Sequence, residues 1–275
     1  MRRFLSIAVV SLGLGACGGG GGASSSMPGA QSPERQSEGE YDLAREAFYK
    51  GEPREALAHV RKAIELDDEN AKALYFASAI HLSFCVQSTE TVDCRLGDAE
   101  SYARRSMKAD EHFHDARNLL GQVLILMKRY REAASILEPL TRDMAYSANH
   151  LAWGNLGWAQ VLGGDLDHGI SSLENSITQP KFCVGHYRLG IAYEKKGDLH
   201  QADAAFTHAV TVDAPECREL QEAWEARGRV RAHLGRQDDA RNDFQRCREI
   251  ARETPTGRAC ARQLGQAPQA IGMIP

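Results

Sequence analysis

Small and apolar residues recur in a fixed order between residues 38 and 250. The clearest copy runs Leu189, Gly190 and Tyr193, then Ala202 and Phe206. One small residue marks the first half of each copy, at positions 44, 78, 121, 157, 190 and 228, and another marks the second half, at positions 56, 99, 133, 169, 202 and 240. The interval between them is 12 residues in five copies and 21 in one. Because small residues let two helices cross closely, the pattern predicts six pairs of packed helices.

The breaks within the copies also follow a rule. Four copies have a glycine between the two helices, at Gly51, Gly164, Gly197 and Gly235. Glycine adopts the left-handed conformation at low cost, and helices often end on such a residue. The second copy instead carries nine extra residues, within the stretch from Phe84 to Leu96 that includes Cys85 and Cys94.

This order of residues resembles the tetratricopeptide repeat (TPR), whose motif W-x2-L-G-x2-Y followed by A-x3-F recurs with a period of about 34 residues. The resemblance implies an all-α fold, namely a right-handed TPR α-solenoid of about six helix–turn–helix repeats. Residues 248–264 follow the sixth repeat, and we expect them to form a helix that caps the open end of the stack.

The N-terminus has the pattern of an export signal. Arg2 and Arg3 precede an apolar stretch at residues 4–14, which is shorter than the roughly 20 residues that a membrane-spanning helix needs. The sequence Leu14-Gly15-Ala16-Cys17 follows. It resembles the lipobox of bacterial lipoproteins, in which the cysteine is lipidated, for example with palmitate, and becomes the first residue after cleavage.

The lipobox resemblance has an alternative, in which an ordinary signal peptide is cut near Ala16 and Cys17 is incidental. If the lipobox is real, Gly18 stands where an aspartate would retain the protein in the inner membrane. The resemblance then implies a lipid anchor in the outer membrane, with the folded domain in the periplasm.

Composition divides the chain into four expected segments: a lipoprotein signal peptide at 1–16, the lipidated cysteine and a flexible Gly/Ser/Pro tether at 17–36, the TPR solenoid with its capping helix at 37–264, and a disordered tail at 265–275. A tether of this length has a root-mean-square reach of roughly 25 Å.

Apart from Cys17, six cysteines remain, and export to an oxidising compartment makes disulfides the expected state. Sequence alone leaves many pairings open, but the repeat register brings certain cysteines close together. We predict three disulfides, Cys85–Cys94, Cys183–Cys217 and Cys247–Cys260. The alternative is that some of these residues are buried free thiols. A zinc site is not expected, because the chain has no C-x2-C spacing.

Composition and motifs favour recognition over catalysis. The net charge is −4, with 33 basic and 37 acidic residues scattered among one another, so a basic face for nucleic acid is not expected. No serine lies in a G-x-S-x-G motif, and no glycine-rich phosphate loop is present. We therefore expect no enzyme activity, no cofactor and no metal.

In TPR proteins, fixed positions of each first helix line the concave face of the solenoid. The matching residues that we expect to form a partner-binding groove are Tyr41, Tyr75, Leu151, Trp158, Tyr187 and Ile191. Others at such positions, Leu82, Ile125 and Val161, could instead belong to the packing between helices. Repeat six is polar at these positions, with Glu222, Glu225 and Arg229.

This set differs from the Lys, Asn and Arg residues of chaperone-binding TPR clamps. A largely apolar groove with aromatic anchors is suited to an amphipathic helix or an extended apolar peptide.

The combination of lipobox, tether and TPR array resembles the pilotin lipoproteins of type IV pilus systems (the PilF, PilW and Tgl type). Pilotins guide the secretin, a multimeric outer-membrane pore, to its place of assembly. The resemblance implies that the groove binds a secretin subunit while the lipid holds the protein at the membrane. The alternative is a TPR lipoprotein adaptor for cell-envelope enzymes or for outer-membrane protein assembly.

Overall fold

The computed structural model describes residues 32–87 and 92–266, which form helices and turns without strands. The described residues fall into two compact units, the first ending at Phe113 and the second beginning at His114. Residues 1–31 and 267–275 lie outside the described residues, so the signal peptide, the lipidation of Cys17 and most of the tether and tail stay predictions.

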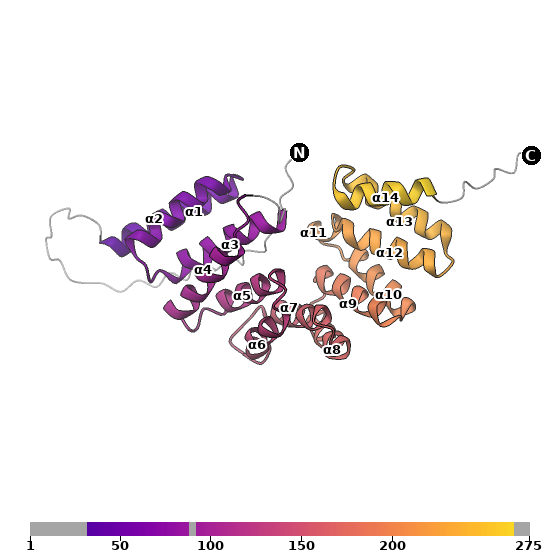
Figure 1. Ribbon diagram of the computed structural model, residues 1–275, viewed down its shortest axis with the longest axis horizontal. Helices are drawn as coiled ribbons and strands as arrows, with labels where there is room; N and C mark the ends of the chain where they lie inside the picture. The colour runs from indigo at the N-terminus through magenta and orange to yellow at the C-terminus, as the bar shows by residue number, and fades with distance from the viewer. Residues whose placement is uncertain (1–31, 88–91, 267–275) are drawn as a thin grey trace, which may run out of the picture. The chain divides into compact units, whose positions relative to one another are not determined.

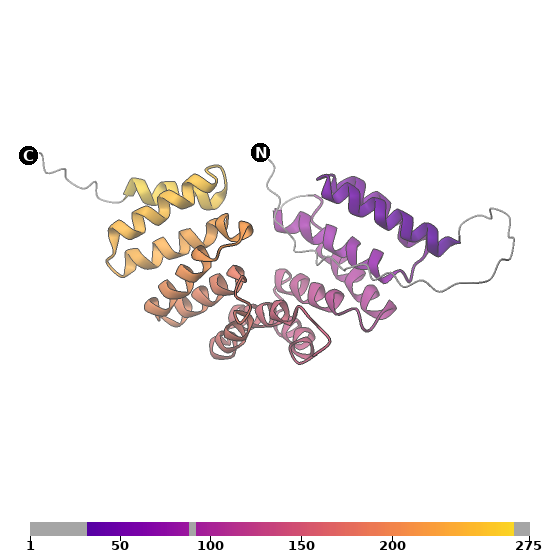
Figure 2. The ribbon, with the colours of Figure 1, turned by 180° about the vertical axis from the view of Figure 1, so that it is seen from behind.

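Successive helices pack as pairs within each unit, and they can be followed by colour in Figures 1 and 2. The first unit contains α1 (Pro33–Tyr49), α2 (Pro53–Leu66), α3 (Ala71–Gln87) and α4 (Leu96–Ala109). The second unit contains α5 (His114–Leu126), α6 (Tyr130–Thr141), α7 (Asn149–Leu162), α8 (Leu166–Ser176), α9 (Cys183–Lys196), α10 (Leu199–Thr211), α11 (Pro215–Arg218), α12 (Gln221–His233), α13 (Gln237–Ile250) and α14 (Pro255–Gln266). None of the described helices combines the length and hydropathy needed to cross a bilayer.

The predicted helix pairs are confirmed as α1/α2, α3/α4, α5/α6, α7/α8, α9/α10 and α12/α13. Their small residues lie where the two helices of a pair meet. A Cβ added to Gly190 would lie 2.5 Å from the Phe206 ring, and one added to Gly121 would lie 2.5 Å from the Leu137 side chain. The small residue is therefore required because the large residue of the second helix fills its place.

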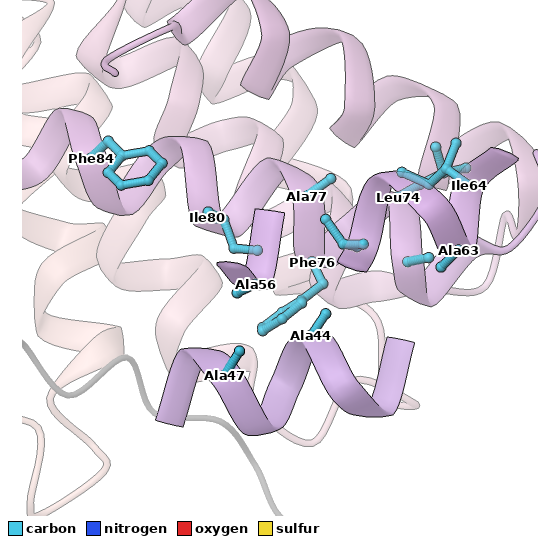
Figure 3. Close-up of a cluster of buried hydrophobic side chains, with 12 residues drawn as sticks. Ala44, Ala47, Ala56, Ala63, Ile64, Leu74, Phe76, Ala77, Ile80 and Phe84 are labelled. Atoms are coloured by element: carbon cyan, nitrogen blue, oxygen red, sulfur yellow. The ribbon is translucent and has the colours of Figure 1, made fainter. Parts of the chain in front are cut away.

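The core of the first unit shows the same principle with alanine (Figure 3). Ala44 and Ala56 are both completely buried. Phe76 of the next repeat packs edge-on against Tyr41 and Phe48, with ring centroids 5.8 and 5.5 Å away. Side chains of neighbouring repeats thus bury one continuous cluster, which a single helix pair could not do alone.

Three helix boundaries differ from expectation. The predicted tether is wrong in its last four residues, because α1 begins at Pro33, where Ser32 caps the helix by accepting from the backbone N–H of Arg35 at 3.4 Å. The insertion in repeat two starts later than expected, because α3 continues through Phe84, which is buried. The predicted tail is wrong at Gly265 and Gln266, which α14 includes.

All three predicted disulfides are confirmed. The Cα atoms of the bonded cysteines are 4.5, 5.8 and 6.2 Å apart for Cys85–Cys94, Cys183–Cys217 and Cys247–Cys260. Each bond joins segments that already pack together, as the repeat register indicates. The short helix α11, which carries Cys217, has no counterpart in the predicted pattern.

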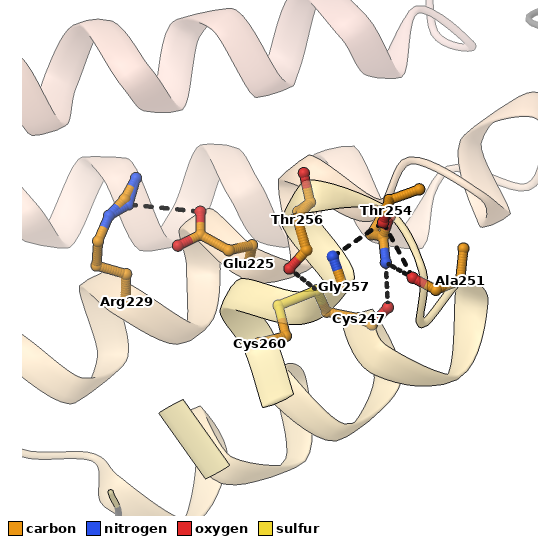
Figure 4. Close-up of a disulfide and its surroundings, with 9 residues drawn as sticks. Glu225, Arg229, Cys247, Ala251, Thr254, Thr256, Gly257 and Cys260 are labelled. Atoms are coloured by element: carbon orange, nitrogen blue, oxygen red, sulfur yellow. Dashed lines mark hydrogen bonds and ion pairs between the residues drawn. A yellow bond between two sulfur atoms is a disulfide. The ribbon is translucent and has the colours of Figure 1, made fainter. Parts of the chain in front are cut away.

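The last disulfide holds the capping helix α14 against α13 (Figure 4). Gln221 of α12 supports the turn between these helices, because its Nε2 donates to the Cys247 carbonyl at 2.6 Å. Thr254 Oγ1 donates to Gln221 Oε1 at 2.6 Å and accepts from the Gly257 N–H at 2.9 Å. The predicted capping segment is therefore tied to the sixth repeat by covalent and polar bonds.

The turn glycines have the left-handed conformation that the sequence predicts, with φ values of 79°, 92°, 86° and 78° for Gly51, Gly164, Gly197 and Gly235. Repeat three has no glycine at this place. Lys128 stands there instead, seven residues after Gly121, with φ of 60°. A non-glycine residue pays about 1 to 2 kcal/mol for this conformation, so repeat three carries a local strain that the four glycine turns avoid.

We expect Lys128→Gly to raise the free energy of unfolding by roughly 0.5 to 1 kcal/mol, because removal of the strain outweighs the extra freedom of glycine in the unfolded chain. Gly197→Lys is the matched reverse change, since a Cβ at Gly197 would meet no atom within 4 Å. It should lower stability by about 1 kcal/mol. Urea unfolding followed by circular dichroism measures both, and a Lys128→Gly variant no more stable than wild type would contradict the assignment of strain.

Candidate functional site

The candidate site lies on the first helices of repeats three to six, α5, α7, α9 and α12, each of which contacts the next within the second unit. We call the surface that α7, α9 and α12 share the helix-A face. Its members are Leu151, Trp158, Tyr187, Arg188, Ile191, Glu222, Glu225 and Arg229.

The six predicted groove residues divide between the two units. Tyr41 and Tyr75 belong to the first unit, where both are half-buried; Tyr75 packs on Phe113 with ring centroids 5.1 Å apart. The other four, Leu151, Trp158, Tyr187 and Ile191, are half-buried residues of the helix-A face. The predicted groove residues are thus incompletely covered by their own unit.

Three residues could be assigned from the sequence either to the groove or to the packing between helices, and the structure places all three in the core. Leu82, Ile125 and Val161 are 5%, 7% and 2% exposed. Their positions on the first helices turn them towards the packing between helices, so they offer no surface to a partner.

Trp158 is positioned by the core beneath it. Its indole packs on the cluster that includes Val161, Ile170 and Leu189. The guanidinium of Arg188, on the neighbouring helix α9, lies over the indole at 5.7 Å from the ring centroid, a favourable cation–π arrangement. The indole is therefore fixed in place while part of its surface remains uncovered.

Tyr187 is the second fixed aromatic side chain of the face. Its ring lies 6.0 Å from that of Phe206 on α10. Burial, reinforced by the charges of Glu222 and Glu225, raises the pKa of Tyr187 to about 12. The hydroxyl is thus protonated at neutral pH and can donate a hydrogen bond to a partner.

The α12 end of the face is acidic, as the polar positions of repeat six predict. Arg229 bonds to Glu194 at 3.0 Å and lies 3.7 Å from Glu225. Burial and the nearby carboxylates of Glu194 and Glu222 raise the pKa of Glu225, against the opposing effect of Arg229. Glu194 and Glu225 thus share one cation, and Glu222 adds a further negative charge nearby.

A polar network that sequence reasoning missed links α5, α7 and α9. Asn155 Nδ2 donates to Asn118 Oδ1 at 2.9 Å, and Arg188 Nη1 donates to Asn155 Oδ1 at 2.9 Å and to the Gly154 carbonyl at 3.0 Å. Burial lowers the pKa of Arg188 to about 10, which still leaves it protonated at neutral pH. The sequence held one sign of this network: a polar residue, Asn155 or Arg188, stands directly before the Leu-Gly pair in repeats four and five.

The other features of the described residues offer no comparable site. No cluster of His, Cys, Asp and Glu side chains in residues 32–87 and 92–266 could hold a metal ion. A cavity of about 610 Å³ in the first unit is open and lined by charged residues of both signs, among them Glu34, Glu38, Asp67 and Lys72. The helix-A face is therefore the best candidate for recognition.

Comparison with known proteins defines the class. The family model described as "Tetratricopeptide repeat" matches residues 41–83 and 187–255. These two segments therefore carry tetratricopeptide repeats, and the expected all-α TPR solenoid is confirmed as the fold class. Proteins of this class generally act as scaffolds that bind other proteins.

Three solved structures illustrate the likeness. PilW, a "widely conserved type IV pilus biogenesis factor", has a TM-score of 0.68 and 18% identity over 82% of this chain and 98% of its own. PilF of Pseudomonas aeruginosa has a TM-score of 0.63 and 14% identity over 85% of this chain and 100% of its own. A TPR protein from Parabacteroides merdae has a TM-score of 0.65 and 14% identity over 83% of each chain. At these identities the likeness establishes the fold alone, and no curated protein sequence matches the chain.

His186, which precedes Tyr187 on α9, is held as a neutral imidazole. Its ring stacks on that of His208, with centroids 5.2 Å apart. Burial, together with the charge of His208, lowers the pKa of His186 from 6.5 to about 4. The folded state therefore binds a proton less readily than the unfolded state does.

This depressed pKa predicts a loss of stability in acid. The contribution of His186 is fully present above pH 6.5 and is lost as the pH falls from 6.5 towards 4. We expect His186→Gln to show a smaller loss between pH 7 and pH 4.5 in urea unfolding than wild type. His168→Gln is the control, because that side chain is 78% exposed, and an acid sensitivity equal in all three proteins would contradict the prediction.

Proposed function

We propose that this chain is a lipid-anchored TPR scaffold of the outer membrane that binds a secretin subunit and acts as a pilotin in type IV pilus biogenesis. In this proposal Cys17 carries the lipid and the folded repeats stand in the periplasm. The partner segment is an amphipathic helix or an extended apolar peptide that lies on the helix-A face.

The observation that carries the proposal is the row of incompletely covered apolar side chains on α7 and α9. Leu151, Trp158, Tyr187 and Ile191 are all half-buried. Apolar area left in water is a source of binding free energy when a partner covers it. Rigid aromatic side chains are also frequent anchors of interfaces, because their ordering costs little.

The likeness to PilW and PilF supports a role in type IV pilus biogenesis. It extends over nearly the full length of both proteins and over most of this chain, and PilW is described as a pilus biogenesis factor. The lipobox-like sequence ending at Cys17 adds support, since a protein that guides an outer-membrane pore would act at that membrane.

We expect Trp158→Ala to weaken binding of the purified full-length protein to the secretin subunit by tenfold or more, which corresponds to about 1.4 kcal/mol. The matched control is Trp153→Ala. Trp153 is also half-buried on α7, and five residues along a helix place it about 140° away around the axis. Isothermal titration calorimetry gives the affinities, and circular dichroism melting shows whether each variant is folded.

Several outcomes would contradict the proposal. A folded Trp158→Ala variant that binds the secretin subunit as wild type does would place the partner elsewhere. Loss of the gene with normal pili and normal secretin multimers would remove the pilotin role. Altered septation or wall turnover in that strain would instead favour an adaptor for cell-envelope enzymes.

The membrane anchor has its own test. Cys17→Ser removes the sulfur that would carry the lipid. We expect this variant to move from the membrane fraction to the soluble periplasmic fraction, since the described helices contain no bilayer-spanning segment. Tight membrane association of the variant after a mild salt wash would contradict lipid anchoring.

A further inference from the structure

Arg188 differs from the other arginines of the helix-A face and its surroundings. Arg229 is paired with Glu194, and Arg227 is paired with Asp243 at 2.6 Å. No carboxylate of the described residues lies within ion-pair distance of Arg188, whose hydrogen-bond acceptors are the neutral oxygens of Asn155 and Gly154. A half-buried cation without a counter-ion is costly, and a bound anion would offset that cost.

The guanidinium group retains donors for such an anion. Of its five N–H groups, those on Nη1 reach the Gly154 and Asn155 oxygens. Within the described chain, Nε and Nη2 make no hydrogen bond. These two nitrogens form the edge of the guanidinium that binds a carboxylate through two parallel bonds.

The side chains around Arg188 determine which chemical groups could lie next to a bound anion. Trp158 lies under the guanidinium on α7, and Tyr187 precedes Arg188 on α9. Beyond Tyr187, the charges of Glu222 and Glu225 reach the phenol from α12. Apolar surface is thus present on both sides of the cation, while the acidic α12 end disfavours a second carboxylate there.

We propose that Arg188 binds the carboxylate of an aspartate or glutamate side chain within the apolar partner segment, whose flanking apolar residues cover Trp158 and Tyr187. This inference rests on the proposed function, and it names the chemical group that the helix-A face recognises in the partner segment. A side chain is favoured over a chain terminus, because apolar surface on both sides of Arg188 lets the segment continue in both directions. The network through Asn155 to Asn118 fixes the guanidinium before the segment arrives.

Three fluorescein-labelled peptides test the proposal with the full-length protein by fluorescence anisotropy. All share one amphipathic Leu- and Phe-containing sequence with an acetylated N-terminus. The first has a central Glu and an amidated C-terminus. The second replaces that Glu with Gln. The third is the Gln peptide with a free C-terminal carboxylate. We expect the Glu peptide to bind at least tenfold more tightly than both others.

Two variants assign this preference to its residue. Arg188→Gln should bind the Glu and Gln peptides with equal affinity. Arg229→Gln is the control, because Arg229 already has carboxylate partners, and it should keep the tenfold preference. Circular dichroism melting establishes that both variants are folded at the assay temperature. If Arg188→Gln proves unfolded there, Arg188→Lys replaces it and should reduce the preference, since lysine cannot form the paired bonds.

The possible results separate the two proposals. Equal binding of the Glu and Gln peptides by wild type would overturn the role of Arg188 but leave the apolar face intact. A preference that persists in Arg188→Gln would also overturn it. Tighter binding of the peptide with the free C-terminus would show a site for chain ends instead. Failure of wild type to bind any of the peptides would contradict the apolar face, and the inference with it.

Discussion

Close contact between the two helices of each repeat is the constraint on which the rest of the structure depends. In four of the repeats the first helix presents a glycine to a large side chain of the second, as Gly157 does to Leu173 and Gly228 to Phe244. A Cβ on either glycine would lie within 3 Å of that side chain, so the pair would have to move apart. Because neighbouring repeats within each unit pack on one another, a displaced pair would also disturb its neighbours.

That packing fixes what each first helix can offer to a partner. One side of α7 and α9 is used by the second helices and the core, and the remaining side carries Trp158, Tyr187 and Arg188. At the C-terminal end the core is supplemented by a buried ion network, in which Asp243 accepts from both Arg227 and Arg231. Such a network is costly to break once formed, and with the Cys247–Cys260 bond it holds the last repeats in one arrangement.

Much of the fold could be predicted because its determinants are local and repeated. The spacing of the small residues fixed each helix pair, and the repeat register identified the cysteines that pair, since Cys183 and Cys217 are one repeat apart. The ends of the helices were harder to predict. α1 begins earlier than predicted, after the cap at Ser32, and α3 continues past the buried Phe84 to Gln87. A cap or a buried contact of this kind does not follow from the repeat spacing.

The candidate site was predictable only in part. Trp158 and Tyr187 stand at positions that the TPR resemblance assigns to a groove, whereas the role of Arg188 depends on Asn118, Asn155 and Trp158 from two other helices. Arg188 has no carboxylate partner among the described residues, and this cannot be predicted from a sequence in which acidic residues outnumber basic ones, 37 to 33. The role of Lys128 was also not predicted from the sequence, because only its backbone geometry reveals that it replaces a turn glycine.

The central claim is that a partner binds on the helix-A face. Photo-crosslinking in cells tests it most directly, with a photoreactive amino acid placed at Glu222, an exposed residue beside Tyr187. The comparison position is Ser171, an exposed residue of the second helix α8. Our account predicts a crosslink from position 222 to a secretin subunit and none from position 171. A crosslink to the secretin from position 171 alone would contradict it.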